Sequence, residues 1–462
     1  MSSELDVLNP FDFEKVGQIK TCTWADIDGM LDGASELFKK RSSWLPAFER
    51  IAILQKTAAL MRARFDELAL VIAQEGGKPL MDARIEVERA IGGVELCVHE
   101  IGQMGGQQIP MDLTEAGSGR IAFTQREPIG VVVATSAFNH PLNLIVHQVG
   151  PAVAVGCPIL VKPALETPLS CKTFVEILHE AGLPAEWCRF APCEIDVAEK
   201  MVTDPRVAFF SFIGSARVGW MLRSKLAPGT RCALEHGGAA PVIVDDTADV
   251  DAMIPLLVKG GFYHSGQVCV SVQRVFSPKK TARAIAEKLA HAASQLMVGN
   301  AIDPNVDCGP LIRPGEVDRV EEWVNEAVSE GAQVLTGGKR LGPTTFQPTV
   351  LLDPPSNVRI SRMEVFGPVV CVYSCNDLDE AILRANEIPF AFQAAVFTRE
   401  LDAAMRTVKD LNASAVMVND HTAFRVDWMP FAGRGQSGYN IGGIGYTMHD
   451  MTQDKMAVIK LQ

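Results

Sequence analysis

Apolar residues recur at intervals of three and four through much of the first hundred residues, most clearly over 47–79. This spacing places them on one face of a helix, and a glycine pair stops the run. We therefore expect the first hundred residues to be mainly helical. Over 107–127 the pattern changes to short extended segments around two glycines, which predicts a hairpin.

From residue 129 onwards, strand-like apolar runs alternate with helical ones. Strands are predicted over 129–137, 158–164 and 207–214. Helices are predicted over 143–156, over 168–182 and directly after 214. Such alternation predicts a parallel sheet covered by helices on both faces, with a ligand crevice at the carboxyl ends of its strands.

The alternation restarts after the pair Gly237-Gly238, and helical stretches follow near 248–260, 280–297, 315–330 and 377–387. A chain of 462 residues is too long for one ordinary core. We therefore predict an α/β protein with two doubly wound parallel-sheet domains, to which the segment 107–127 and the apolar tail MAVIKL add a hairpin and a strand.

Charge and composition narrow the class of partner. The net charge is −12, and binding to nucleic acid or to an acidic membrane surface requires a basic face, so neither is expected. The stretch 128–161 has no charged residue, but three prolines and several polar residues interrupt it. A buried strand-helix-strand unit is therefore favoured over a membrane span.

The N-terminal residues and the cysteines indicate the cellular compartment of the protein. The first twenty residues are acidic early and have no apolar run of the length that a secretory signal requires. The eleven cysteines are irregularly spaced and include no CxxC pair, which argues against a disulfide framework or a metal site. We expect a cytoplasmic protein without a metal, with most thiols in the core.

One cysteine stands apart. Cys269 follows the polar, glycine-containing turn HSGQV and precedes an alternating apolar run. A free thiol with a pKa of about 8.5 is mostly protonated at pH 7, so Cys269 taken alone is better interpreted as a small core residue. Its position in a loop at a strand end, where reactive groups are usually held, favours a nucleophile.

The segments GQVC and LEHGG (234–238) resemble the nucleophile and general-base segments of the aldehyde dehydrogenase superfamily. The separation of Glu235 from Cys269, 269 − 235 = 34 positions, agrees with the family pattern. Further segments follow in the family's order: SAFNHPLN (136–143), VKPALETP (161–168), FIGSARVG (212–219), EVFGPV (364–369), VND (418–420) and PFAGRGQSG (430–438). Together they span about residues 128–438.

The resemblance implies three catalytic residues. Cys269 would attack the aldehyde carbon and form a thioester, because an aldehyde cannot release hydride before its carbon is tetrahedral. The Asn139 amide, with the Cys269 backbone N–H, would stabilise the oxyanion, and Glu235 would activate the hydrolytic water. Taken alone, Asn139 is better interpreted as a helix cap, and Glu235 is equally typical of a solvated strand end.

The resemblance also implies an NAD or NADP site. The residues it assigns to that site are Lys162 and Glu364 at the riboses, Phe366 beside the nicotinamide, and Gly214, Ser215 and Gly219 at the pyrophosphate, where a helix N-terminus favours an anion. Many NAD-preferring relatives have an acidic residue three positions after the lysine, but this chain has Leu165. The sequence therefore leaves the choice between NAD and NADP open.

The substrate is expected to be a short aldehyde. The loop HTAFRVDWMPFAG after VND resembles a subgroup that acts on hydroxylated or anionic aldehydes. Arg425 is the candidate anion clamp because a guanidinium binds carboxylate, phosphate or sulfonate in a bidentate manner, unless it pairs with Asp427 or is exposed. Phe138, His140, Arg274 and Phe424 are further candidates for the substrate pocket.

By resemblance, residues 1–106 and 128–236 form a Rossmann-like dinucleotide-binding domain and 237–448 the catalytic domain. The segments 107–127 and 449–462 would join subunits into a homodimer or homotetramer. The implied reaction is NAD(P)-dependent, non-acylating oxidation of an aldehyde to its acid. Two alternatives are a non-catalytic dinucleotide-binding member of the fold and an acylating acyl-CoA or acyl-phosphate reductase, against which Glu235 argues.

Overall fold

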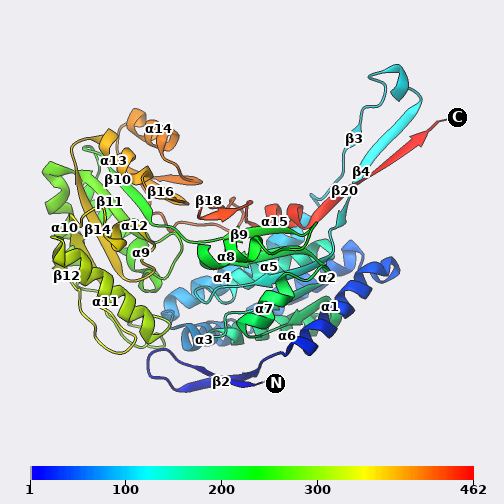
Figure 1. Cartoon of the computed structure of the whole chain (residues 1–462), viewed down its shortest axis with the longest axis horizontal. Coiled ribbons are helices and arrows are strands. Elements are labelled where there is room, and N and C mark those ends of the chain that lie inside the picture. The colour runs from blue at the N-terminus through cyan, green and yellow to red at the C-terminus, as the bar shows by residue number, and fades with distance from the viewer. Residues whose placement is uncertain (1–2, 462) are drawn as a thin grey trace.

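The computed structural model describes residues 3–461, which form two α/β domains and a projecting three-stranded sheet (Figure 1). The first domain contains a six-stranded sheet with the order β19-β9-β8-β5-β6-β7. These strands are β5 (Val131–Thr135), β6 (Ile159–Lys162), β7 (Cys188–Phe190), β8 (Val207–Ile213), β9 (Arg231–Glu235) and β19 (Gly438–Tyr439). Strands β5 to β9 pair in parallel, whereas β19 pairs antiparallel with β9.

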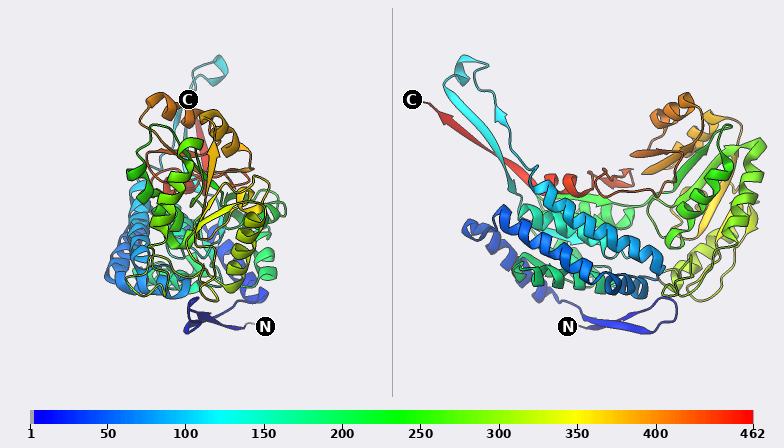
Figure 2. Two further views of the ribbon diagram at one scale, coloured as in Figure 1. Left: turned by 90° about the vertical axis from the view of Figure 1, so that its left-hand side faces the viewer. Right: turned by 180° about the vertical axis from the view of Figure 1, so that it is seen from behind.

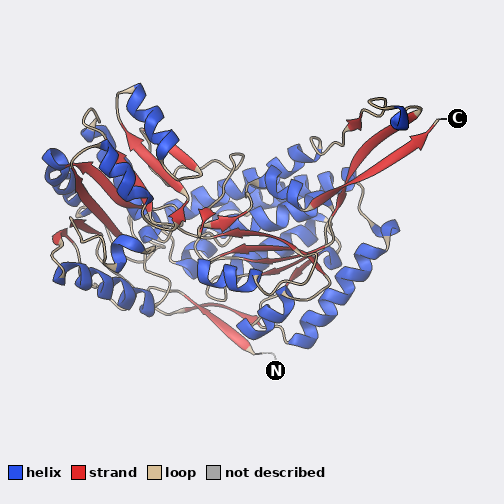
Figure 3. Cartoon of the chain, turned by 45° about the horizontal axis from the view of Figure 1, so that its top comes forward, coloured by secondary structure: helices blue, strands red, loops and turns tan. Residues whose placement is uncertain are grey.

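Helices cover both faces of this sheet, as predicted (Figure 3). Alternate residues of β5 point to opposite faces: Val132 and Ala134 pack into one hydrophobic cluster, and Val131 and Val133 into another. The first cluster includes α2 (Ala47–Ala63), α3 (Phe65–Gly76), α4 (Leu80–Ile101), α5 (Asn143–Val155) and α6 (Pro168–Ala181). The second includes α1 (Trp24–Lys39), α7 (Ile195–Val202) and α8 (Ala216–Arg223).

The second domain contains a seven-stranded sheet with the order β12-β13-β14-β11-β10-β16-β17. These strands are β10 (Ala240–Val244), β11 (Val272–Pro278), β12 (Gln333–Thr336), β13 (Thr349–Leu352), β14 (Val369–Cys375), β16 (Gln393–Phe397) and β17 (Ala415–Val418). Its helices are α9 (Val250–Phe262), α10 (Lys279–Ala293), α11 (Pro314–Ser329), α12 (Arg359–Arg362), α13 (Leu378–Asn386) and α14 (Leu401–Asp410). The predicted α/β class with two mainly parallel sheets is confirmed.

The helical prediction for the first hundred residues misses one element. Strands β1 (Glu4–Leu8) and β2 (Lys15–Lys20) pair antiparallel before α1 begins. Their residues are mostly exposed, and of these two strands only Val7 and Ile19 are buried, so an apolar alternation is barely visible. Helix α1 begins after Thr23, where Thr23 and Asp26 form a reciprocal capping box.

A three-stranded sheet projects from the first domain (Figure 2). It contains β3 (Gln108–Ile109), β4 (Arg120–Pro128) and β20 (Thr452–Lys460). Strand β20 pairs with the full length of β4, from Thr452 opposite Pro128 to Lys460 opposite Arg120. The predicted hairpin and the predicted added strand therefore form one sheet.

The last residues of the segment predicted as the catalytic domain, 237–448, pack in the first domain and not in the second. Strand β19 joins the first sheet, and α15 (Ile444–Asp450) places Ile444 and Met448 in the core of the first domain. A short ladder between β15 (Phe390–Ala391) and β18 (Arg434–Gly435) precedes this return. No local pattern signals the crossing, because β19 and α15 are short and their partners in the first domain, β9, α4 and α5, lie roughly 200 to 350 residues earlier.

Candidate active site

A cavity of about 780 Å³ lies between the two domains and is lined by residues of both. The first domain contributes loops at the carboxyl ends of β5, β6, β8 and β9, as expected for an open parallel sheet. The second contributes Cys269 and Glu364, which precede strands β11 and β14, and the loop after β17. The cavity brings together Asn139, Glu235 and Cys269 although they are far apart in the sequence.

Cys269 lies in a loop that two anchors hold. The preceding 3-10 turn η4 (Tyr263–Gly266) places His264 and Ser265 at φ of 47° and 54°. Gln267 then fastens the loop to a neighbouring segment: its amide donates to the Pro310 carbonyl at 3.2 Å and accepts from the Ile312 N–H at 3.0 Å. The position of Cys269 is therefore set by contacts that its own sequence motif does not reveal.

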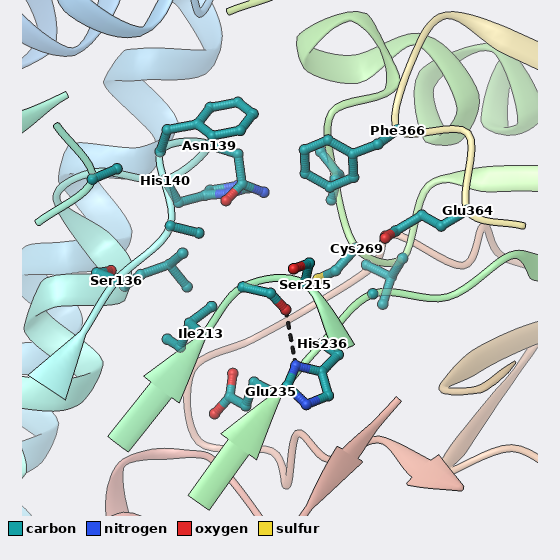
Figure 4. Close-up of a pocket in the computed structure, with 18 of the residues that line it drawn as sticks. Ser136, Asn139, His140, Ile213, Ser215, Glu235, His236, Cys269, Glu364 and Phe366 are labelled. Carbon is teal, nitrogen blue, oxygen red and sulfur yellow. Dashed lines mark hydrogen bonds between the residues drawn. The ribbon is translucent and has the colours of Figure 1, made fainter. Parts of the chain in front are cut away.

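Asn139 reaches this loop from the other domain. Its Nδ2 donates to the Gln267 carbonyl at 2.9 Å, two residues before Cys269. The amide has a second hydrogen, so it can still donate to an oxyanion. Asn139 is buried and lies just before α5, and both Asn139 and Cys269 border the cavity (Figure 4).

Glu86, on α4, supports the Asn139 loop and was not predicted. Its Oε1 accepts from the Leu142 and Asn143 N–H groups at 2.9 and 3.0 Å, at the start of α5. Its second oxygen pairs with Lys78, and both side chains are buried. A carboxylate at a helix N-terminus satisfies free N–H groups, so Glu86 holds the start of α5 in place.

Glu235 ends strand β9 and faces the cavity. Surrounding protein removes bulk water and raises the pKa of its carboxyl group to about 7, although Arg425 nearby opposes this shift. The carboxylate is turned toward Gly442, where a Cβ would lie 2.0 Å from Oε1, and it points away from Cys269 (Figure 4). A carboxyl group with this pKa can exchange protons near neutral pH.

The Cys269 thiol is protonated in this state. Burial raises its pKa to about 12, the negative charge of Glu364 adds to the shift, and Arg425 opposes it. The ten other cysteines are also unpaired, and most are buried. What distinguishes Cys269 is therefore its position in the cavity and not a low intrinsic pKa.

Several polar atoms of residues that line the cavity have no hydrogen-bond partner among the described residues. They include Glu364 Oε1, Ser136 Oγ and Thr135 Oγ1. Burial raises the pKa of Glu364 to about 8, and Lys162 Nζ donates to the Pro163 carbonyl at 3.1 Å. Polar groups without protein partners that line the same cavity as an ammonium group fit the hydroxyls of a dinucleotide.

The other predicted cofactor residues divide into two groups. Gly214 and Ser215 line the cavity at the start of α8, where free N–H groups suit a pyrophosphate. Phe366, at φ of 46°, holds its ring edge-on to Phe138 with 5.8 Å between centroids. Gly219 is not among the residues that line the cavity, and a Cβ there would instead meet the His236 ring.

The predicted substrate residues are also partly corrected. Arg425 lines the cavity, lies over the Phe431 ring at 3.6 Å and approaches His147 Nδ1 at 3.4 Å, but forms no ion pair with Asp427. Phe138, His140 and Phe424 line the cavity as well. Arg274 does not, because its buried guanidinium donates to carbonyls of the second domain, such as that of Ala239 at 2.9 Å.

The partner of Asp427 is Arg89, which sequence inspection missed. The two form a bidentate pair with distances of 2.7 and 3.0 Å, and His147 Nε2 lies 2.8 Å from the same carboxylate. Leu165 does not line the cavity, and the neighbouring Glu166 pairs with Arg313 at 3.2 Å. Arg89 and Asp427 are 338 positions apart, so no local signal could have found their contact.

Residues 3–461 lack two other classes of feature. These residues contain no group of three or more His, Cys, Asp or Glu side chains arranged to hold a metal ion. Their helices include none with the length and apolar character needed to cross a bilayer.

Comparison with known proteins adds an independent result. The model of the aldehyde dehydrogenase family matches residues 1–457. A 3-sulfolactaldehyde dehydrogenase of Priestia aryabhattai is 35% identical over 461 residues, covering 100% of this chain and 96% of that protein. A lactaldehyde dehydrogenase of Methanocaldococcus jannaschii is 33% identical, covering 99% of this chain and 97% of that protein.

Two solved structures superpose closely on this chain. Aldehyde dehydrogenase 21 from Physcomitrella patens, in complex with the reaction product succinate, superposes with a TM-score of 0.95 at 35% identity and covers 99% of this chain and 95% of its own. Glyceraldehyde-3-phosphate dehydrogenase GapN from Methanocaldococcus jannaschii, complexed with NADP, gives a TM-score of 0.94 at 32% identity. That match covers 100% of this chain and 99% of the other.

Proposed function

The chain belongs to the aldehyde dehydrogenase family and is an NAD(P)-dependent enzyme, and from this premise we propose that it oxidises a short anionic aldehyde to the free carboxylic acid. The observation that carries the proposal is Arg425, which has no carboxylate partner among the described residues and lines the same cavity as Cys269, Asn139 and Glu235. A partly buried guanidinium without a counterion favours a ligand that supplies one.

The first step forms a bond between Cys269 and the substrate. Sγ attacks the aldehyde carbon, and the carbonyl oxygen becomes an oxyanion that accepts hydrogen bonds from Asn139 Nδ2 and the Cys269 N–H. The attacking thiol must lose its proton, because its resting pKa is about 12. That proton passes to solvent, so Glu235, with a pKa of about 7, remains available as the base of the later hydrolysis step.

The second step oxidises the carbon. When bound, the cofactor supplies a nicotinamide that accepts hydride, and Lys162, Gly214, Ser215, Glu364 and Phe366 would hold it. Loss of hydride converts the Cys269 adduct to a thioester. Phe366 and the neighbouring Phe138 form an apolar wall on this side of the cavity, which limits the access of water during the transfer.

The third step releases the acid. Glu235 takes a proton from water, the hydroxide attacks the thioester carbon, and the Cys269 sulfur leaves as the C–S bond breaks. For this step the carboxylate must turn from Gly442 toward Cys269. The consequence is a free carboxylate, not an acyl-coenzyme A.

The substrate class follows from Arg425 and its support. Stacking on Phe431 fixes the guanidinium plane, and its Nε has no hydrogen-bond partner among the described residues. Asp427 is held by Arg89 and His147, so it does not neutralise Arg425 directly. The names of relatives, 3-sulfolactaldehyde and lactaldehyde dehydrogenases, support a short hydroxylated or anionic substrate.

The test compares anionic and neutral aldehydes of equal chain length in the wild type and in Arg425→Gln. We expect Arg425→Gln to lower kcat/KM for sulfonated, phosphorylated or carboxylated aldehydes about 100-fold, because a charge-assisted bidentate contact is lost. The neutral aldehyde is the control for any effect of Arg425 on Cys269 and Glu235. Equal losses for both substrate classes, or product released only as acyl-coenzyme A, would contradict the proposal.

The projecting sheet supports a further expectation. Met456, Val458 and Ile459 on β20 are each about half exposed, at 55%, 48% and 49%. Apolar side chains on a projecting strand favour burial against another copy. We propose that the sheet of β3, β4 and β20 joins subunits into a homodimer or homotetramer.

A further inference from the structure

His236, the residue after Glu235, is buried and has no part in the proposed chemistry. Its Nδ1 lies 2.9 Å from the Gly214 carbonyl oxygen (Figure 4). A carbonyl oxygen only accepts, so Nδ1 carries the proton and Nε2 holds a lone pair. Nε2 is buried and has no partner among the described residues. The hydrogen bond from Nδ1 to Gly214 is therefore the one polar contact of this imidazole ring within the described residues.

Gly214 is held on both sides by two consecutive residues. Its N–H donates to the Glu235 carbonyl at 3.0 Å, and its own carbonyl accepts from His236 Nδ1. The backbone N–H of His236 in turn donates to the Ser437 carbonyl at 3.0 Å. The loop after β8 is therefore fastened to the strand that carries the general base.

This fastening orients the peptide between Gly214 and Ser215. In a planar trans peptide the carbonyl and the N–H point in opposite directions. Because His236 holds the Gly214 carbonyl on one side, the Ser215 N–H is directed to the other. Ser215 is the N-cap of α8 and lines the cavity, so this N–H belongs to the set of free groups at the helix start.

Gly219 makes room for the imidazole. A Cβ at this position would lie 2.0 Å from His236 Cε1 and 2.6 Å from Nε2. The ring also lies edge-on to Phe212 and Trp220, with centroids 5.5 and 5.9 Å apart. These contacts fix the ring plane, so Nδ1 donates to the Gly214 carbonyl in a single ring orientation.

We propose that His236 is a positioning residue for cofactor binding: it holds the Gly214–Ser215 peptide so that its N–H can meet the pyrophosphate of the dinucleotide. The proposal rests on the proposed NAD(P) site at Gly214 and Ser215. His236 borders the cavity, but its Nδ1 is engaged with the Gly214 carbonyl, and we assign it no contact with the reacting atoms. Its effect is therefore expected in the dissociation constant of the cofactor and not in the chemical step.

Three substitutions separate the hydrogen bond from the volume of the side chain. In His236→Asn the side-chain amide can occupy the position of Nδ1 and donate to Gly214. In His236→Gln the amide lies one bond further out, and in His236→Leu there is no donor. We expect His236→Leu and His236→Gln to raise the Kd of NAD⁺ or NADP⁺ about tenfold, and His236→Asn to keep a Kd within about threefold of the wild type.

The Kd is measured by isothermal titration without aldehyde, on the whole chain. Hydrogen exchange of the 212–219 segment supplies a second readout: we expect faster exchange in Leu and Gln than in Asn or the wild type. If His236→Leu does not fold, the comparison of Asn with Gln decides, because Gln matches the volume of histidine better than Asn does. A purely structural role predicts that Gln is the better replacement.

Equal cofactor affinity in all four proteins, or Gln binding more tightly than Asn, would overturn the positioning role. Failure of the proposed substrate class is visible separately, because it concerns aldehyde turnover in the wild type and leaves these dissociation constants unchanged. Failure of the wild type to bind either dinucleotide would overturn both the cofactor site and the role of His236.

Discussion

Two groups of ionisable residues lie at one cavity or directly beside it, and they differ in their partners. In the first, Asp427 is bonded by Arg89 and His147, with Asn143 Nδ2 at 3.3 Å. In the second, Glu235 and Glu364 have no ion-pair partner within the described residues, and neither does the neighbouring thiol of Cys269.

The pKa values follow the difference in partners. Burial alone would raise the pKa of Asp427, but hydrogen bonds and charge from His147 and Arg89 hold it well below its usual range. Burial raises the pKa of Glu235 to about 7 and that of Glu364 to about 8, because no cation balances either carboxylate closely. The paired group maintains structure, and the unpaired groups can exchange protons or accept a ligand.

Removing the thiol should have the largest effect within the unpaired group. We expect Cys269→Ala to lower turnover by at least about 10⁴-fold while NAD(P)⁺ still binds, since no other group can form the covalent adduct. Steady-state absorbance of reduced nicotinamide and isothermal titration measure the two properties. The matched control is Cys375→Ala, whose buried thiol does not line the cavity; activity retained in Cys269→Ala would remove it from the mechanism.

Glu235→Gln should separate the two halves of the reaction. The first hydride transfer should persist as a burst of reduced nicotinamide of about one equivalent per site, whereas steady turnover should fall about 10³-fold because the thioester persists. Rapid mixing and mass spectrometry of the acyl enzyme check this expectation. A wild-type steady-state rate without a burst would exclude Glu235 as the base.

Breaking the paired group should cost stability. Asp427→Asn keeps the size of the side chain but leaves the partly buried Arg89 without its counterion, and we expect a loss of about 3 kcal/mol in the free energy of unfolding. Urea unfolding followed by circular dichroism measures it. Asp318→Asn, in an exposed pair with Arg340, is the control and should have no measurable effect.

A smaller effect is expected from pH. The carboxylate form of Glu235 acts as the base, and its pKa is raised to about 7, so hydrolysis should increase as pH rises through 7. Between pH 8 and pH 6 the ionised fraction falls about tenfold, and the deacylation rate should fall with it. Single-turnover release of the acid measures this rate, and Glu235→Gln should show no such dependence.

The sequence predicted the residues of the candidate site but not the residues that hold them in place. Asn139, Glu235 and Cys269 were predicted from ordered motifs, and the structure places all three at one cavity. Gln267, which anchors the Cys269 loop, lay inside a quoted motif but had no assigned role. Glu86 was not identified because its contact with the start of α5 joins residues 56 and 57 positions apart.

Local sequence patterns predicted the features that depend on the burial of single strands and helix faces. Burial of a strand between two helical layers requires an apolar run, and burial of one helix face requires a period of three to four, so both are visible along the chain. The two-domain α/β fold followed from these patterns, and the catalytic class followed from the order of the motifs.

Tertiary structure decided which charges are paired and which are left reactive. Arg89 could have served the substrate, yet it holds Asp427, whereas Arg425 is left without a carboxylate. Gly219 serves the His236 ring, and the chain returns to the first domain at β19. These outcomes depend on contacts between distant segments, whose electrostatic and steric effects act through space and leave no periodic signal in the sequence.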